Sequence, residues 1–244
     1  MSQLSVQPNS NISFSVLKEA SGFLAVHKPA GVPTQPGVKH MHDTLLNGLF
    51  ADYGHELQNL GKKRDFGLLH RLDLAVSGVL LVGRTTQGYD YLRTLFVERE
   101  IEKTYLCIVH GTLTGKGSVN HAIREVRLKG EKTAQIGSHP RAKPAKTEFQ
   151  GLAFGQGLSL VKCTILSGRL HQIRIHMASL GHPVLGDFKY GRQTPRDRVL
   201  GRNRIGLHAA SIAFKEAGKR RKTRIDDPLP HDLDALVARC GMLS

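Results

Sequence analysis

The sequence contains no tryptophan, and aromatic residues make up only 6% of it. This scarcity argues against a protein that binds nucleic acid through a broad platform of stacked bases. Its three cysteines are scattered and include no CxxC pair, so the sequence predicts neither a disulfide framework nor a zinc knuckle. No long apolar run is present, and the N-terminus lacks a basic segment followed by an apolar one. We therefore expect a reduced, soluble, cytoplasmic protein without a membrane span.

Several motifs of cofactor and metal chemistry are also missing. The sequence has no Walker A loop, no GxGxxG after a predicted strand and no HExxH. His40 and His42 precede Asp43, but a histidine pair in a polar loop is usually incidental. His171 and His176 lie on a predicted helix at a spacing that points them in different directions, which does not suit a shared ligand set. We expect neither a metal nor an organic cofactor.

Positive charge is what the sequence has in excess. It contains 35 Lys and Arg residues against 20 Asp and Glu residues, a formal net charge of +15 at pH 7. Such an excess points to a polyanionic partner, most often nucleic acid, with an anionic membrane surface as the lesser alternative. The 244 residues and the hydrophobic content of 40% suffice for one large domain or two small ones with a packed core.

Hydrophobic periodicity predicts strands and helices in mixed order. Apolar or alternating runs predict strands at 23–26, 79–82, 105–109, 147–154, 158–166 and 207–214. Helical spacing predicts helices at 44–50, 89–96, 170–180 and 231–240. A loop is expected at 53–66 and a hairpin-like excursion at 112–146. Because strands and helices do not alternate regularly, we expect an α+β fold on a largely antiparallel sheet. We expect a flexible arm over 1–20 and a single domain over 21–244.

The tetrapeptide HRLD places Asp73 shortly before the strand predicted at 79–82. A carboxylate in a short loop at the start of a strand can be held on rigid backbone at the floor of a cleft. The ordinary alternative is a turn-forming aspartate beside a surface salt bridge. The local sequence does not decide between the two.

Two further segments stand out. In SGRLHQIR (167–174), Arg174 lies beside the predicted apolar stripe of Ile173 and Met177. An arginine at the edge of an apolar face tends to need a carboxylate partner, although a snorkelling or phosphate-binding arginine is an alternative. In EKTY (102–105), Tyr105 opens an apolar strand, where a core tyrosine is the ordinary interpretation.

These segments together resemble the RluA-type RNA pseudouridine synthases from Gly22 to Pro230. The motifs that carry the resemblance are HKPAGVPTQPG (27–37), HRLDLAVSG (70–78), EKTY (102–105), KPAKTEF (143–149), SGRLHQIRIHMASLGHPVLGDFKYG (167–191) and LHAASIAF (207–214). The motif at 167–191 is highly specific, and it occurs in the expected order after HRLD. The resemblance favours the catalytic interpretation of Asp73.

The resemblance implies a pseudouridine synthase fold with flanking helices and a central RNA-binding cleft. It implies that Asp73 is the essential catalytic residue, that Tyr105 stacks on the target uracil and that Arg174 forms a salt bridge with the aspartate. The substrate-binding residues that we expect around them are His70, Arg71, Leu207, Arg169, His171 and Gln172, with Leu207 closing the pocket. The expected partner is a structured ribosomal or transfer RNA whose target uridine is flipped out, and we expect a monomer.

The reaction explains why these residue types are needed. Isomerising uridine breaks the N1–C1′ bond, rotates the freed uracil and rejoins it through C5, without redox chemistry or phosphate transfer. It needs an ionised carboxylate in a dry pocket, and a nearby arginine lowers the pKa of such a group by roughly 1 to 3 units against the effect of burial. The carboxylate could attack the sugar, attack the base or remove a sugar proton to give a glycal, and the sequence does not choose. Access to a base atom also requires extrusion of the nucleotide from its stack.

Basic residues crowd two segments in the last quarter of the chain. We expect both segments to bind RNA phosphates beside the cleft, and the alternative is a solvated basic face. The predicted phosphate contacts are Arg192, Arg196, Arg198, Arg202 and Arg204 in the first segment and Lys219, Arg220 and Arg221 in the second.

Two positions depart from the pattern of the family. Val76 stands where a threonine is usual, and Gln35-Pro36 stands where His-Pro is frequent. Both changes affect the expected RNA selection more than the activity. Because only about twenty residues precede the resemblance, target choice is expected to come from the catalytic domain itself.

Two other functions stay open at this point. A non-catalytic RNA-binding protein or ribosome assembly factor on the same fold would also bind RNA, but only the enzyme needs Asp73, Tyr105 and Arg174 together. A glycosidase or nucleoside hydrolase usually needs two carboxylates flanking the scissile bond. The matched motifs supply one such carboxylate, which makes this function the weaker alternative.

Overall fold

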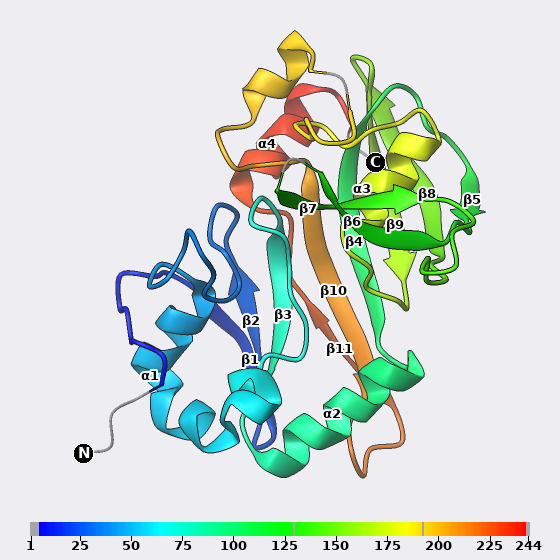
Figure 1. Cartoon of the computed structure of the whole chain (residues 1–244). Helices are drawn as coiled ribbons and strands as arrows, with labels where there is room; N and C mark the ends of the chain where they lie inside the picture. The colour runs from blue at the N-terminus through cyan, green and yellow to red at the C-terminus, as the bar shows by residue number, and fades with distance from the viewer. Residues whose placement is uncertain (1–4, 129, 192, 243–244) are drawn as a thin grey trace. The chain divides into compact units, whose positions relative to one another are not determined.

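The computed structural model describes residues 5–128, 130–191 and 193–242, and the chain divides into two compact units. Unit 1 comprises Met1–Ile101 and Ala209–Asp227, and unit 2 comprises Glu102–His208 and Pro228–Ser244. The two units are therefore interleaved along the sequence. Each combines antiparallel strands with helices (Figure 1), as the predicted α+β class requires. A single domain over 21–244 stays a prediction.

Five of the described strands belong to unit 1. Their order is β1 (Ser15–Glu19), β2 (Phe23–Lys28), β3 (Ser77–Gly83) and β10 (Leu207–Lys215), and β11 (Lys222–Asp226) pairs with β10. The pairs β1–β2, β2–β3 and β10–β11 are antiparallel. Every residue of β3 is buried, which explains why this strand is a continuous apolar run in the sequence. Gly78 lies so close to β10 that a Cβ there would be 2.4 Å from the Ala209 carbonyl oxygen.

The helices α1 (Leu45–Leu60) and α2 (Thr86–Glu98), with the short 3-10 helix η1 (Lys62–Gly67), complete unit 1. Thr44 begins α1 with a capping box, in which the Asn47 N–H donates to the threonine hydroxyl and the Thr44 N–H donates to Asn47 Oδ1. The helix predicted at 44–50 continues because Leu57 and Leu60 extend its buried stripe. The loop predicted over 53–66 is wrong for this reason.

The N-terminal segment has defined contacts where the sequence predicts a flexible arm over 1–20. Val6 is only 7% exposed, and the Asn9 N–H donates to the Asn47 carbonyl at 2.9 Å. The buried amide of Asn47 in turn donates to the Gln7 carbonyl at 2.7 Å. Further along, Ser15–Glu19 forms β1. The described part of the arm is therefore packed on α1 and the sheet, whereas residues 1–4 lie outside the described residues.

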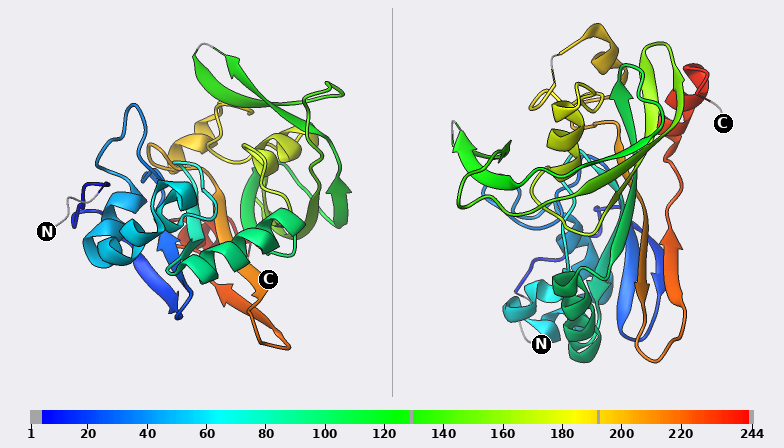
Figure 2. Two further views of the ribbon diagram at one scale, coloured as in Figure 1. Left: turned by 60° about the horizontal axis from the view of Figure 1, so that its bottom comes forward. Right: turned by 90° about the vertical axis from the view of Figure 1, so that its right-hand side faces the viewer.

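Unit 2 contains four antiparallel strands, which form one continuous part of a sheet, and a separate hairpin. The four strands have the order β4 (Glu102–His110), β9 (Leu158–Ile165), β8 (Thr147–Gly155) and β5 (Lys116–Val119). The hairpin of β6 (Ile123–Leu128) and β7 (Glu131–Ile136) stands apart from it (Figure 2). The strands β5, β6 and β7 lie where the sequence predicts a hairpin-like excursion at 112–146. The β8–β9 turn at Gln156 and Gly157 has positive φ at both residues, as a two-residue hairpin loop requires.

Three helical segments pack on the sheet of unit 2: α3 (Gln172–Ser179), the 3-10 helix η2 (Pro195–Val199) and α4 (His231–Arg239). Leu233, Leu236 and Val237 of α4 belong to a buried cluster with Ile108 and Leu158 of the sheet. The predicted helix at 170–180 is shorter than expected because His171 adopts a left-handed conformation with φ 52°. Within the described residues, no helix has the length and apolar character needed to cross a membrane.

Candidate functional site

Asp73 lies at the turn that leads into β3 of unit 1. Residues 68–70 lie antiparallel beside the end of β3: Leu68 forms an isolated β-bridge with Val82, and the Leu81 N–H donates to His70 Nε2 at 2.9 Å. The Asp73 carbonyl then accepts from the Val76 N–H at 3.0 Å, which closes the turn. The partly buried Asp73 is therefore presented at the end of β3 where the strand begins.

The backbone on both sides of Asp73 is held by the segment that follows β2. The Thr34 hydroxyl donates to the Leu72 carbonyl at 2.8 Å and accepts from the Leu72 N–H at 3.2 Å. On the other side, the Gly31 N–H donates to the Leu74 carbonyl at 2.8 Å. With both neighbours held, the Asp73 Cα has little freedom to move.

Lys28 is fully buried and supports the same turn. Its Nζ donates to the carbonyls of Pro29 at 2.8 Å, Val32 at 2.6 Å and Leu74 at 3.5 Å. A buried ammonium is tolerated when carbonyl oxygens satisfy its donors. Lys28 and Thr34 belong to the motif HKPAGVPTQPG (27–37). No local sequence pattern around either residue predicts that its side chain is buried beside the Asp73 turn.

His70 and Arg71 differ in their surroundings. Because His70 Nε2 accepts from the Leu81 N–H, that nitrogen carries no proton, and the ring packs 5.1 Å from the ring of Phe96 on α2. The structure thus gives this nitrogen a role in holding the Asp73 segment to β3. Arg71 is exposed, as a residue that contacts a substrate would be.

Arg174 of unit 2 forms a two-bond ion pair with Asp187. Its Nε donates to Asp187 Oδ2 at 2.7 Å and its Nη2 to Oδ1 at 2.8 Å. The side chain of Asp187 is 1% exposed and that of Arg174 is 11% exposed. The prediction that Arg174 needs a carboxylate is confirmed by Asp187, a residue that the sequence analysis does not single out. The salt bridge between Arg174 and Asp73 stays a prediction.

Tyr190 joins Arg174 to the β6–β7 hairpin. Its ring centroid lies 5.3 Å from Cζ of Arg174. Its hydroxyl accepts from the Ala134 N–H at 2.8 Å, and it lies 2.6 Å from His171 Nδ1 and 3.1 Å from Thr133 Oγ1. Burial raises the pKa of this hydroxyl, which therefore keeps its proton and donates to one of these two neighbours. Tyr190 is the second functional candidate that the sequence analysis does not single out.

Gln172 has a structural role in place of the predicted contact with the substrate. Its Nε2 donates to the Lys146 carbonyl at 2.9 Å and to Thr147 Oγ1 at 3.2 Å. Its Oε1 accepts from Ser167 Oγ at 2.9 Å and from the Arg169 N–H at 3.1 Å. Both donors and both lone pairs of the buried amide are thus engaged, which leaves nothing for a substrate. The amide shapes the turn that carries Arg169, whose side chain is partly exposed.

Tyr105 and Lys103 lie on the same face of β4 because side chains alternate along a strand. Tyr105 is 8% exposed, and Lys103 is 7% exposed. Burial, with a smaller effect of the Arg169 charge, lowers the pKa of Lys103 to about 8. Its Nζ donates to the Leu166 carbonyl at 3.3 Å, just before the SGRL turn. Leu207, the predicted pocket-closing residue, is the first residue of β10 and is 4% exposed.

Of the predicted phosphate contacts, one is buried, one lies outside the described residues and six are exposed. Arg204 does not fit the prediction, because it is 8% exposed and its Nε donates to Asp232 Oδ2 at 2.6 Å. Arg192 lies outside the described residues. The exposed side chains that fit the prediction are Arg196, Arg198, Arg202, Lys219, Arg220 and Arg221.

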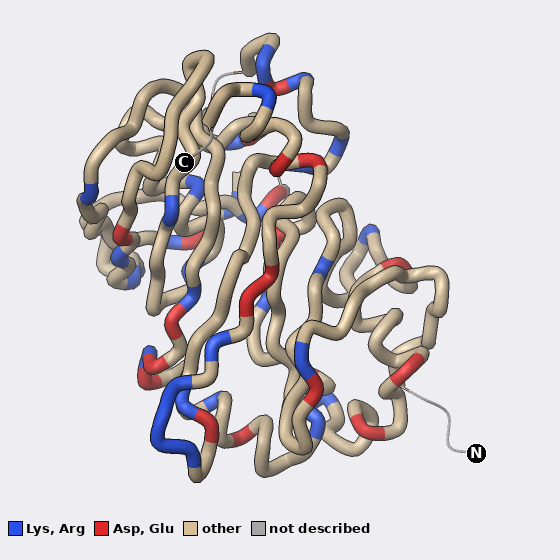
Figure 3. The backbone as a smooth tube through the Cα atoms, turned by 180° about the vertical axis from the view of Figure 1, so that it is seen from behind, with Lys and Arg blue, Asp and Glu red and all other residues tan. Residues whose placement is uncertain are grey.

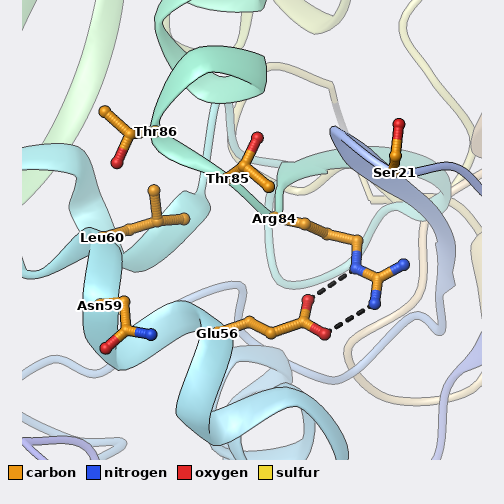
Figure 4. A pocket seen from close by; sticks show the side chains of 7 residues that line it. All are labelled: Ser21, Glu56, Asn59, Leu60, Arg84, Thr85 and Thr86. Atoms are coloured by element: carbon orange, nitrogen blue, oxygen red, sulfur yellow. Dashed lines mark hydrogen bonds and ion pairs between the residues drawn. The ribbon is translucent and has the colours of Figure 1, made fainter.

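A cavity of about 440 Å³ in unit 1 contains none of the predicted site residues. It is lined by Ser21, Glu56, Asn59, Leu60, Arg84, Thr85 and Thr86 (Figure 4). The Arg84 guanidinium is held by Glu56 at 2.6 Å and by Glu19 at 2.6 Å, so its charge is already compensated. Across the part of the chain that the structure describes, no three His, Cys, Asp or Glu side chains gather into a group that could hold a metal ion.

Comparisons with known proteins agree with the motifs around these residues. The family model for RNA pseudouridylate synthase matches residues 22–179. The chain is 31% identical over 230 residues to ribosomal large subunit pseudouridine synthase D of Zymomonas mobilis, covering 93% of this chain and 72% of the relative. It is also 31% identical to the protein of that name from Nitrosomonas europaea, covering 93% of this chain and 65% of the relative.

Solved structures show the same fold. The human RNA pseudouridylate synthase domain containing 1 matches with a TM-score of 0.71 at 27% identity, covering 94% of this chain and 90% of that one. The human RNA pseudouridylate synthase domain containing 4 matches with a TM-score of 0.72 at 19% identity, covering 94% of both chains, and supports the fold alone.

Proposed function

The chain belongs to the RNA pseudouridylate synthase family, and we propose that it isomerises uridines of ribosomal or transfer RNA to pseudouridine with Asp73 as the catalytic residue. The observation that carries the assignment of Asp73 is its rigidly held turn. Thr34 bonds both backbone groups of Leu72, while Gly31 and Lys28 bond the carbonyl of Leu74. A carboxylate that must meet one atom of a nucleotide benefits from such positioning.

Residues such as Asp73, Tyr105 and Arg174 can supply the chemistry that the proposed reaction needs. The N1–C1′ bond of uridine breaks, the uracil turns within the pocket, and a C5–C1′ bond forms while the hydrogen at C5 is released as a proton and N1 takes up a proton. The Asp73 carboxylate would begin this sequence at the sugar or at the base. No oxidant, reductant or phosphate donor takes part.

Tyr105 and Arg174 complete the proposed chemistry. The Tyr105 ring would receive the extruded uracil by stacking, and Leu207 would close the apolar side of the pocket. Arg174 would keep Asp73 ionised by its positive charge. The ion pair with Asp187 supports this role, because it holds the guanidinium in one orientation.

The names of the bacterial relatives favour a uridine of the large ribosomal subunit RNA as the target. Arg71, Arg169 and His171 are the remaining candidates for contact with the flipped nucleotide, and Arg196, Arg198 and Arg202 for contact with nearby phosphates. Action as a monomer in the cytoplasm stays a prediction from the sequence.

Mapping of pseudouridines tests the proposed function. Unmodified transcripts of large-subunit ribosomal RNA and of transfer RNAs are incubated with the protein, derivatised with a carbodiimide that marks pseudouridine, and copied by reverse transcriptase. We expect stops at one or a few uridines that are absent without protein. Binding of these RNAs without any new stop would favour the non-catalytic RNA-binding alternative.

A further inference from the structure

A strongly basic turn connects β10 and β11 in unit 1. Residues 215–224, here called the basic hairpin, contain one carboxylate, Glu216, and six basic residues. The exposed basic residues are Lys215, Lys219, Arg220, Arg221, Lys222 and Arg224. In Figure 3 this turn appears as a continuous blue stretch at one end of the chain trace. The hairpin contains no aromatic residue, so it offers charge without a surface for base stacking.

Glu216 orders the base of the basic hairpin without neutralising its tip. Its carboxylate pairs with Lys18 of β1 at 3.1 Å and with Lys219 at 2.6 Å, and it accepts from the Thr223 hydroxyl. Burial raises its pKa, but these hydrogen bonds outweigh burial and lower the pKa to about 2. Among the described residues, no carboxylate lies within ion-pair distance of Arg220, Arg221 or Lys222.

The basic hairpin lies at the opposite end of unit 1 from Asp73. The first residues of β3, next to the Asp73 turn, touch β10 at Ala209, where a Cβ on Gly78 would be 2.5 Å from the Ala209 nitrogen. The last residue of β3, Gly83, touches Tyr89 of α2, and the Tyr91 hydroxyl of the same helix donates to the Lys215 carbonyl at 3.0 Å. From Ala209 to Lys215, β10 extends about 20 Å at about 3.3 Å per residue. Figure 1 shows the hairpin beside α2, far from the start of β3.

We propose that the basic hairpin is a remote anchor that binds backbone phosphates of the target RNA about 20 Å or more from Asp73. This inference rests on the proposed function, since it takes the partner to be the RNA that is modified. Unpaired Arg and Lys side chains on an ordered turn suit phosphates, which carry no sequence information. The anchor would therefore strengthen binding to a large folded RNA without reading the bases around the target uridine. The anchor lies away from Asp73, whereas the sequence led us to expect phosphate contacts beside the cleft.

The test compares two RNAs and two triple variants. The RNAs are a long ribosomal RNA fragment and a stem-loop trimmed to a few base pairs on either side of the mapped uridine. The test variant is Arg220→Gln/Arg221→Gln/Lys222→Gln, which leaves the ion pairs of Glu216 intact. The control variant, Lys116→Gln/Lys146→Gln/Arg239→Gln, removes the same charge from exposed positions of unit 2. Thermal unfolding of both variants checks the fold.

For the long RNA, we expect the hairpin variant to raise KM about tenfold or more and to reduce the log–log salt slope of binding by about 2 to 3. The control variant should behave like the wild type. For the trimmed stem-loop, the hairpin variant and the wild type should differ less than twofold in kcat/KM. If unfolding shows that the triple variant is not folded, Arg220→Glu alone replaces it, with the same expected direction.

Two results would overturn the anchor. An equal fall in kcat/KM on both RNAs would place the hairpin at the catalytic site. An unchanged KM and salt slope on the long RNA would show that the hairpin is a solvated basic surface. Absence of activity in the wild type would instead contradict the proposed function. In that case the salt slope of binding to the long RNA would still test the anchor.

Discussion

Asp187 holds both Nε and Nη2 of Arg174, at 2.7 and 2.8 Å, from a position that is almost completely buried. The ring of Tyr190 covers the same guanidinium at 5.3 Å. Arg174 is therefore oriented by unit 2 itself, through residues on the segment that follows α3. This relationship fixes the orientation of an arginine in a recognisable motif.

Removing Asp187 should destabilise the protein strongly. Asp187→Ala leaves the guanidinium of Arg174 buried without this carboxylate, and loss of one partner of a buried pair costs about 3 to 5 kcal/mol. Urea denaturation followed by circular dichroism measures the free energy of unfolding. Glu148→Ala, which breaks the exposed pair with Lys146, should change it by less than about 1 kcal/mol. Equal effects of the two substitutions would contradict the role of Asp187.

Tyr190→Phe should loosen the β6–β7 hairpin while keeping the ring over Arg174. The Ala134 N–H loses its acceptor, and an unsatisfied buried donor costs about 1 to 3 kcal/mol. Amide hydrogen exchange of β7 should accelerate at Ala134, and kcat/KM should fall. In Tyr91→Phe, a matched control, exchange at Ala134 should stay as in the wild type. Unchanged protection of Ala134 in Tyr190→Phe would argue against the contact.

The contribution of Lys103 to the stability of the protein should rise with pH between about 8 and 10.5. Its folded pKa is lowered to about 8 from an ordinary value of 10.5, so the unfolded chain binds the proton more tightly throughout this window. Below pH 8 the fold carries the cost of a buried ammonium, at most about 3 kcal/mol, and this cost disappears as pH approaches 10.5. The difference in unfolding free energy between wild type and Lys103→Met, measured from pH 7 to 11, isolates this residue from other titrating groups. A difference that is constant with pH would rule out the perturbed lysine.

Thr34→Val should lower kcat without weakening RNA binding. The substitution keeps the shape of the side chain but leaves the N–H and carbonyl of Leu72 without the hydroxyl that bonds both of them. The free energy of unfolding should fall by about 1 to 3 kcal/mol, and the Asp73 turn should become less ordered. Thr34→Ser retains the hydroxyl and should restore most of the activity. The role fails if valine and serine variants have the same kcat.

The sequence predicts the fold elements well where burial is simple. β3 is buried on both faces and is a continuous apolar run in the sequence. The Gly-Gln-Gly turn at 155–157 predicts the β8–β9 hairpin. The partner of Arg174 could not be predicted in the same way, because Asp187 reaches it through a turn at Gly186 with φ 78° that no local periodicity reveals. Lys28 is similar, because its burial depends on three carbonyls that only the folded loops bring together. The prediction that Arg204 binds a phosphate does not fit the structure, where it is buried and paired with Asp232. A cluster of basic residues in the sequence does not show which member forms an ion pair within the fold.

Catalysis of the isomerisation by Asp73 is measured directly by release of tritium from C5 of uridine. Unmodified RNA labelled at C5 is incubated with wild-type protein and with Asp73→Asn, at concentrations where filter binding shows equal occupancy. We expect release by the wild type and none by the variant, because formation of the C5–C1′ bond must expel that hydrogen. Release by Asp73→Asn at the wild-type rate would show that Asp73 is not the catalytic residue.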